Sequence, residues 1–191
     1  MCLLEAGPRG HYPWLHIPIG YAKTMFHPRY NWKFYTEPEP GLHNRQIYWP
    51  RGKVLGGSSA INGLIYIRGQ HQDDDQWADL GNVGWSWADV RPYFMHSERH
   101  QRGVSDYHGD TGPMGVCDVK QPNRLAEAFV QACTQAGYPR NPDFNGENQE
   151  GTGFYQLTTW NGLRSSSASA YLKPARHRSG LHIVTEAQVE Q

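Results

Sequence analysis

The sequence has no net charge and no long apolar run, and each absence excludes a class of protein. Its 191 residues include 18 basic and 18 acidic side chains, so overall charge gives no reason to expect nucleic acid or an anionic membrane as a partner. A membrane-spanning helix needs about 18 consecutive apolar residues, and no such run occurs. The apolar stretch in MCLLEAGPRG is too short for a signal peptide. We therefore expect no integral membrane span and no nucleic-acid partner.

Cysteine is also scarce. Cys2, Cys117 and Cys133 are odd in number, far apart and without CxxC spacing. This pattern indicates neither a disulfide framework nor a zinc ribbon, and it fits a reducing compartment. The length is that of one ordinary domain or of part of a larger one.

Short apolar and amphipathic stretches predict a mixture of helices and strands. A buried strand is expected at Cys2 to Leu4, ending at Glu5, and an irregular connection rich in Pro, Gly and aromatics follows from residue 10 to 50. Helices are predicted at 58–67, 73–80, 86–98 and 123–136, and strands at 181–185 and 187–189. In the first of these helices Gly63 and the β-branched residues leave a strand open as the alternative.

The most informative stretch is RGKVLGGSSAINGLIYIRG, residues 51–69. Its Gly-Gly pair lets the backbone approach another group closely, and Ser58 or Ser59 can cap a following helix. The first amides of such a helix attract an anionic group. Arg51 and Lys53 add local positive charge, although long basic side chains often only cover surface.

Glu5, at the end of the first predicted strand, has two interpretations. It is either a helix-capping or solvent-facing acid, or the acid that accepts hydrogen bonds from ribose hydroxyls at the end of the second strand of a dinucleotide-binding unit. The second interpretation requires a GxGxxG about 20 residues earlier. The printed sequence starts at Met1 and does not include that stretch.

Several motifs in order together resemble one family. LLEAG, TEPEPGL, PRGKVLGGSSAINGLIYIRG, DYHGDTGP, QEGTGFY and NGLRSSSASAYL are similar to segments of the glucose-methanol-choline (GMC) family of flavin oxidoreductases, and especially of its choline dehydrogenase and alcohol dehydrogenase branch. The resemblance covers essentially the whole chain, and RGKVLGGSSAIN resembles the first signature of that family.

The resemblance implies a site for FAD. Glu5 stands where the family binds the adenosine ribose, and Val189 resembles the strand residue whose backbone meets the adenine. Positions that the family places at or beside the pyrophosphate and flavin are Val54, Ser58, Asn62, Gly63, Leu64 and Ile65. Relatives with covalent flavin have a His where this chain has Ile61, so the resemblance implies non-covalent FAD.

The implied activity is the oxidation of choline or another primary alcohol to the aldehyde by hydride transfer to the flavin. The implied electron acceptor is a quinone or another respiratory carrier, and the implied location is cytoplasmic or peripheral to the inner membrane. The sequence does not contain the glycine-rich phosphate loop of the family. It also lacks the C-terminal half, which in this family carries the catalytic His. We therefore expect an internal fragment that is inactive alone, and we assign no catalytic residue.

The expected fold class is α/β, with a mixture of α and β elements in this fragment. The chain would contribute part of a split, Rossmann-like FAD-binding domain and part of a substrate domain. Residues 1–70 would hold the FAD-binding strand, the lid and the signature helix, residues 71–160 would lead towards the substrate domain, and residues 161–191 would return to the FAD-binding domain.

Other residue clusters have simpler explanations. HSERH places His96 and His100 four residues apart around Glu98, a spacing that metals use, but the HExxH order is missing and we predict no metal site. Residues 165–167 are three serines without a G-x-S-x-G elbow, and a helix cap explains them better. Trp85 and Trp87 could form an aromatic box for a quaternary ammonium, although packing is the commoner role of such aromatics.

A hypothesis from another class also remains open at this stage. The chain could be a non-catalytic binding or scaffolding protein that keeps the surface of an ancestral enzyme. It would then form a stable monomer without FAD and melt cooperatively.

Overall fold

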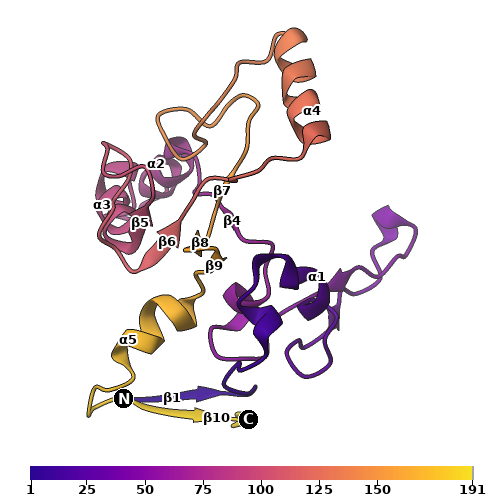
Figure 1. Ribbon diagram of the computed structural model, residues 1–191, viewed down its shortest axis with the longest axis vertical. Helices are drawn as coiled ribbons and strands as arrows, with labels where there is room; N and C mark the ends of the chain where they lie inside the picture. Colours follow the sequence, from indigo (N-terminus) through magenta and orange to yellow (C-terminus); the bar gives the residue numbers. More distant parts are fainter. Residues whose placement is uncertain (191) are drawn as a thin grey trace. The chain divides into compact units, whose positions relative to one another are not determined.

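The computed structural model describes residues 1–190 as a mixture of short helices and short strands (Figure 1). The mixed fold class expected from the sequence is confirmed. Two compact units are present, one made of Met1–Leu64 with Asn161–Gln191 and the other of Ile65–Trp160. No helix among residues 1–190 combines the length and apolar character that a membrane-spanning segment requires.

The first unit is mostly irregular chain between short elements. Its α-helices and strands are β1 (Cys2–Glu5), α1 (Tyr21–Thr24), β2 (Phe34–Tyr35), β3 (Tyr48–Trp49), β9 (Leu163–Arg164), α5 (Lys173–Ala175) and β10 (His182–Thr185). 3₁₀ turns occur at Pro13–Leu15, Pro18–Gly20, Pro40–Leu42 and Gly57–Ala60, and a π-helical turn at Ala168–Leu172. Its apolar core consists of Leu15, Tyr30, Val54, Ala60 and Ile61.

The second unit contains the longer helices. Its elements are β4 (Ile65–Tyr66), α2 (His71–Asp79), α3 (Trp87–Ser97), β5 (Glu98–His100), β6 (Met114–Val116), α4 (Arg124–Gln135), β7 (Gln156–Leu157) and β8 (Thr159–Trp160). β4 pairs with β7 in antiparallel orientation, and β5 pairs with β6 in parallel orientation.

β1 and β10, from opposite ends of the chain, form a parallel two-stranded sheet (Figure 1). Glu5 pairs with Thr185 at its end. The expected strand at residues 2–5 is present but not buried, since Leu4 is 51% exposed and no third strand joins this sheet among the described residues. The strand expected at 181–185 is found as β10, whereas residues 187–189 form no strand.

The helix predicted over residues 58–67 is wrong beyond Ala60. Only the 3₁₀ turn Gly57–Ala60 forms there, and the chain becomes the extended strand β4 at Ile65. The Asn62 side-chain oxygen accepts a hydrogen bond from the Leu64 backbone N–H, and Leu64 has a φ of 71°. A side chain that binds its own backbone two residues on competes with a helix.

The other three predicted helices are confirmed. Ser86 caps α3, where its side chain and that of Asp89 bond each other's backbone N–H groups in a capping box. The Asn123 side chain caps α4 by accepting a bond from the Leu125 N–H. Such caps satisfy donors that a helix leaves unpaired at its start, which is why local sequence was a good guide here.

Candidate functional site

The turn that follows β1 lies directly against the stretch singled out in the sequence. A Cβ added to Gly7 would lie 1.9 Å from the Lys53 carbonyl oxygen, so the two backbones are in contact. The Leu55 N–H also donates to the Pro8 carbonyl oxygen at 3.2 Å. The fold therefore brings together the two sequence features, residues 2–8 and residues 51–69, that motivated a dinucleotide site.

Residues 52–64, named here the Gly-Gly segment, have an unusual backbone. Gly56 and Gly57 have φ values of 93° and 54°, a region that L side chains rarely adopt. The Ser58 hydroxyl accepts a hydrogen bond from the Gly52 N–H at 3.1 Å, and this bond closes the loop on itself. A Cβ on Gly57 or Gly63 would meet no atom within 4 Å, so this side of the segment is open.

A second segment, residues 161–169, forms hydrogen bonds to the Gly-Gly segment. Ser167 donates its hydroxyl to the Gly56 carbonyl oxygen at 3.1 Å and its backbone N–H to the Ser59 hydroxyl at 2.9 Å. The Ser59 hydroxyl in turn donates to the Gly56 carbonyl oxygen at 2.6 Å. Ser167 thus supports a neighbouring loop and makes no side-chain capping bond. Within the predicted cap at 165–167, the Ser166 hydroxyl instead accepts a hydrogen bond from the Ser169 N–H at 3.3 Å.

Arg164 is the strongest link between the two segments. It is 4% exposed. Its guanidinium donates to the Ser59 carbonyl oxygen at 3.1 Å, to the Asn62 side-chain oxygen at 2.6 Å and to the Asn62 carbonyl oxygen at 2.9 Å. Burial lowers the pKa of Arg164 to about 10, which still leaves it charged at neutral pH.

The eight predicted cofactor-binding residues differ in accessibility. Ser58, Asn62, Gly63, Ile65 and Val189 are exposed, Glu5 is half-buried, and Val54 and Leu64 are buried at 0% and 3% exposure. Val54 and Leu64 are therefore enclosed by the chain itself, and the exposed residues are the ones open to a ligand. Glu5 accepts a hydrogen bond from the Gly7 N–H at 2.7 Å, which closes the turn after β1 and is not the helix cap considered from the sequence. A carboxylate has further acceptor sites, so this bond leaves capacity for hydroxyl donors.

Ile61, Arg51 and Lys53 all pack against neighbouring side chains. Ile61 is 4% exposed and belongs to the apolar core of the first unit. The Lys53 ammonium lies 4.5 Å from the centre of the Trp32 ring, and the Arg51 guanidinium 5.1 Å from that of Trp49. Both cations are thus stabilised by aromatic faces.

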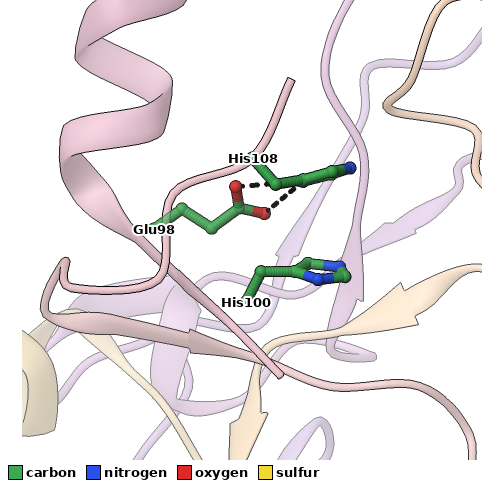
Figure 2. Close-up of side chains that lie close together, drawn as sticks. All are labelled: Glu98, His100 and His108. Atoms are coloured by element: carbon green, nitrogen blue, oxygen red, sulfur yellow. Dashed lines mark hydrogen bonds and ion pairs between the residues drawn. The ribbon is translucent and has the colours of Figure 1, made fainter. Parts of the chain in front are cut away.

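The second unit holds a buried ion network made of Arg68, Glu98, His108 and Asp143. Arg68 pairs with the Glu98 carboxylate at 2.8 Å. His108 contacts both Glu98 oxygens at 3.0 Å through Nδ1 and the Asp143 carboxylate at 2.8 Å through Nε2. Figure 2 shows the Glu98 carboxylate joined to the His108 ring, with the His100 side chain nearby.

The charges in this network alternate in sign. Burial acts to lower the pKa of His108, but the hydrogen bonds to Asp143 and Glu98 outweigh it and raise that pKa to about 9. Burial acts to raise the pKa of Asp143, but the bond from His108 outweighs it and lowers that pKa to about 2. Burial, and then the charge of His108, lowers the pKa of His100. His108 is therefore a cation between two carboxylates, and His100 is neutral.

This arrangement suits an ion network better than a metal site, although Glu98, His100 and His108 place ligand atoms within 4.8 Å of one another. A metal needs a lone pair from each His, and both ring nitrogens of His108 face carboxylates. The His100 and His108 rings stack on each other with their centres 4.2 Å apart. His96, from the HSERH motif, is exposed on α3 and is not part of this group.

The two tryptophans considered for an aromatic box belong to different contacts. Trp85 packs edge-on against Trp77, with ring centres 5.5 Å apart. Trp87 instead stacks on His71 at 4.0 Å. The pair does not form a common box.

Sequence reasoning assigned no role to several residues that organise these sites. Arg164 lies within the motif NGLRSSSASAYL, and the contacts of Arg68, His108 and Asp143 come from loops far apart in the chain. The only signal for Arg164 was its place in a motif, because the carbonyl oxygens that it binds lie about a hundred residues earlier.

Comparison with known proteins gives a consistent result. The sequence profile described as GMC oxidoreductase matches residues 14–191. The chain is 46% identical over 188 residues to an alcohol dehydrogenase [acceptor] from Pseudomonas putida, covering 98% of this chain and 34% of that protein. It is also 46% identical over 182 residues to an oxygen-dependent choline dehydrogenase from Sinorhizobium fredii, covering 95% of this chain and 33% of that protein.

The fold resembles that of solved structures. A crystal structure of pyridoxine 4-oxidase from Mesorbium loti matches with a TM-score of 0.90 and 32% identity, covering 97% of this chain and 37% of that one. An FAD-dependent oxidoreductase from Chaetomium thermophilum matches with a TM-score of 0.83 and 26% identity over 96% of this chain and 33% of that one. The chain therefore spans about a third of the length of these relatives.

Proposed function

The chain belongs to the GMC oxidoreductase family, and from this premise we propose that it forms part of the FAD site of an enzyme that oxidises an alcohol. The observation that carries this proposal is the Gly-Gly segment. One side of this loop is open and carries hydroxyl, amide and backbone donors. Hydrogen bonds from Arg164 and Ser167 fix its conformation.

The residues of the Gly-Gly segment fit an anionic dinucleotide. Ser58, Asn62 and Gly63 are exposed together on a tight loop. Added Cβ atoms on Gly57 and Gly63 would meet nothing within 4 Å, so a ligand can approach this backbone closely. Hydroxyl, amide and backbone N–H donors satisfy pyrophosphate oxygens without requiring a metal. Val54 and Leu64, which are buried, would support the segment from within, and Ile65 would contribute its exposed side chain.

The end of the β1–β10 sheet suits the adenosine. Glu5 retains acceptor capacity there for ribose hydroxyls. The Ala187 N–H donates to the Glu5 carbonyl oxygen at 3.0 Å, which leads the chain past Glu5 towards Val189. We propose that the backbone at Val189 meets the adenine.

We propose that the FAD is bound without a covalent link. Ile61 has no nucleophilic atom, and it packs in the apolar core with Leu15, Tyr30, Val54 and Ala60. A hydrocarbon buried in a core supports non-covalent binding at this position.

Bound FAD would supply the hydride acceptor for oxidation of choline or another primary alcohol to the aldehyde. No residue of this chain is assigned to proton abstraction, and because the chain spans about a third of its relatives we propose that it has no turnover alone. Residues 1–70 and 161–191 would serve FAD binding, and residues 71–160 would lead towards the substrate.

The electron acceptor and location complete the proposal. The names of the two relatives differ in the electron acceptor. One name leaves the acceptor unspecified, and the other says oxygen-dependent. We propose a quinone or another respiratory carrier, and a cytoplasmic or peripheral membrane location. An active enzyme that contains this chain can be assayed both for dye reduction and for oxygen uptake. The comparison would distinguish a respiratory carrier from oxygen as the acceptor.

The test is a titration of the purified chain with FAD, followed by flavin fluorescence and absorbance. Binding should quench the fluorescence and shift the absorbance, and denaturation should release all of the flavin because no covalent link forms. Addition of choline or ethanol with a redox dye should give no dye reduction. Failure to bind FAD would refute the cofactor site, and robust turnover would refute the claim that the chain is inactive alone.

The scaffolding alternative has one observation in its favour. The buried ion network consists entirely of side chains of this chain. A chain that melts cooperatively and identically with and without FAD would support this alternative over the proposed FAD site.

A further inference from the structure

Arg164 differs from an ordinary buried arginine in its partners. The three hydrogen bonds of its guanidinium go to neutral oxygens, two of them backbone carbonyls and one the Asn62 amide. No carboxylate among residues 1–190 forms an ion pair with it. Its Nε atom is buried and has no hydrogen-bond partner.

Such an arrangement is costly for a protein that only needs to fold. A buried charge without a counter-charge loses its hydration, and neutral oxygens repay only part of that loss. An unpaired donor adds to the cost. The arrangement becomes favourable if the nearby loop receives an anionic ligand, because charges interact more strongly away from water.

The bonds of Arg164 fall on both sides of the turn that precedes Leu64. Ser59 belongs to the 3₁₀ turn, and Asn62 sets the positive φ of Leu64 through its own side chain. A planar guanidinium binds these oxygens in a fixed relative geometry, which a lysine ammonium does not reproduce.

We propose that Arg164 is a positioning residue for the cofactor. It locks the Gly-Gly segment into the conformation that presents Ser58, Asn62 and Gly63, and its unneutralised charge favours an anionic dinucleotide on that segment. This inference rests on the proposed FAD site but assigns a role to a residue outside the predicted contact set.

The first test needs no cofactor. Hydrogen exchange is measured on the full chain and on the Arg164→Lys, Arg164→Met and Arg178→Met variants. Arg178 is exposed, so its variant removes the same charge without removing buried bonds. Exchange of the Gly-Gly segment amides, including the internally bonded Ile61 and Asn62 N–H groups, should rise roughly tenfold or more in both Arg164 variants. It should stay at the wild-type rate in Arg178→Met.

The second test titrates FAD into the same proteins. The FAD dissociation constant should rise roughly tenfold in Arg164→Lys, which keeps the charge, and roughly a hundredfold in Arg164→Met, which loses charge and bonds. The reduction potential of the bound flavin should become more negative in Arg164→Met and stay near the wild-type value in Arg164→Lys. A purely structural role would not separate the two variants in this potential.

The outcomes separate this inference from the proposed function. If the wild type binds FAD and both Arg164 variants match it in affinity and exchange, the inference is wrong and the proposed function stands. If the wild type binds no FAD, the cofactor site is wrong, and the cofactor-free exchange still decides whether Arg164 positions the segment. If Arg164→Met does not fold, Arg164→Lys decides: wild-type exchange rates in that variant would overturn the positioning role.

Discussion

Arg68 and Arg164 are both buried, yet their surroundings are opposite. Arg68 meets the Glu98 carboxylate at 2.8 Å, and both side chains are almost fully enclosed. Arg164 meets only neutral oxygens. Breaking a buried ion pair leaves an uncompensated charge, so Arg68 has a sufficient structural reason to be where it is. Arg164 lacks such a reason within the described residues, and this contrast directs attention to the Gly-Gly segment.

At His108 the structure predicts a loss of stability at alkaline pH. Its pKa is raised from 6.5 to about 9 in the folded chain, so its contribution is fully present below about pH 6.5 and is lost as the pH rises through 9. The unfolding free energy should fall by up to about 3 kcal/mol over this range. Asp143, with its pKa lowered to about 2, adds stability that is lost only as the pH falls below about 4. Denaturant unfolding at a series of pH values measures both.

Substitution identifies the group responsible. His108→Gln should remove most of the decline between pH 6.5 and 9, because glutamine does not titrate. His96→Gln, at an exposed position on α3, should leave the decline unchanged. The same slope in wild type and His108→Gln would show that another group controls it.

Asn62→Asp should stabilise the cofactor-free chain. The side-chain oxygen of residue 62 accepts from Arg164 at 2.6 Å and from the Leu64 N–H at 3.1 Å, and an aspartate of the same shape keeps both bonds while supplying the missing counter-charge. Because this position is partly exposed to solvent, we expect a gain of about 1 kcal/mol in unfolding free energy at pH 7.

The comparison is made by denaturant unfolding without FAD. Asn148→Asp, an exposed asparagine in the other unit, serves as the matched control and should change the unfolding free energy little. A destabilised Asn62→Asp chain would mean that the Arg164 charge is already compensated.

At the scale of elements, sequence predicted what local bonds determine. The starts of α3 and α4 were correct because Ser86 and Asn123 bond amides within the next few residues. The helix over 58–67 was wrong partly because Asn62 binds the Leu64 N–H and partly because the segment is held by Arg164 and Ser167, about a hundred residues away. No local pattern contains the contacts of Arg164 and Ser167.

The candidate site was predictable in part for the same reason. The Gly-Gly pair and the acid after β1 are visible in sequence, and the fold brings residues 7 and 53 into contact. The roles of Arg164, Arg68 and His108 depend on partners from distant segments. The contacts of Glu5, Ser58 and Asn62 with a cofactor remain predictions.

Contact between the turn after β1 and the Gly-Gly segment predicts a severe effect of Gly7→Ala. The new Cβ would lie 1.9 Å from the Lys53 carbonyl oxygen and 2.6 Å from the Val54 nitrogen, and backbone atoms cannot swing aside as side chains do. We expect a loss of about 1–3 kcal/mol in unfolding free energy and weaker FAD binding, because Glu5 is displaced from the Gly-Gly segment.

Thermal melting and FAD titration measure the two effects. Gly180→Ala is the control, since a Cβ there would meet no atom within 4 Å. A Gly7→Ala chain with wild-type melting temperature and FAD affinity would show that the two segments do not pack together in solution.

For the whole molecule, the two units differ in how they depend on the rest of the chain. The first unit is built from two separated stretches, and residues 161–169 must return to hold the Gly-Gly segment. The second unit is continuous from Ile65 to Trp160 and contains all four members of the buried ion network. On α4, however, Leu125 and Phe129 are 80% and 68% exposed while Val130 is 4% exposed, so residues 1–190 cover this helix only in part.

A fragment of residues 65–160 should therefore fold by itself. It keeps the pairings of β4 with β7 and of β5 with β6 together with the Arg68–Glu98–His108–Asp143 network, so its unfolding should be cooperative and should weaken between pH 6.5 and 9 as in the full chain. Residues 1–64 alone lack Arg164 and Ser167 and should not unfold cooperatively. Near-UV circular dichroism with denaturant titration measures both fragments. A 65–160 fragment without fixed tertiary structure, or one whose stability does not depend on pH in this range, would mean that the ion network forms only with the first unit present.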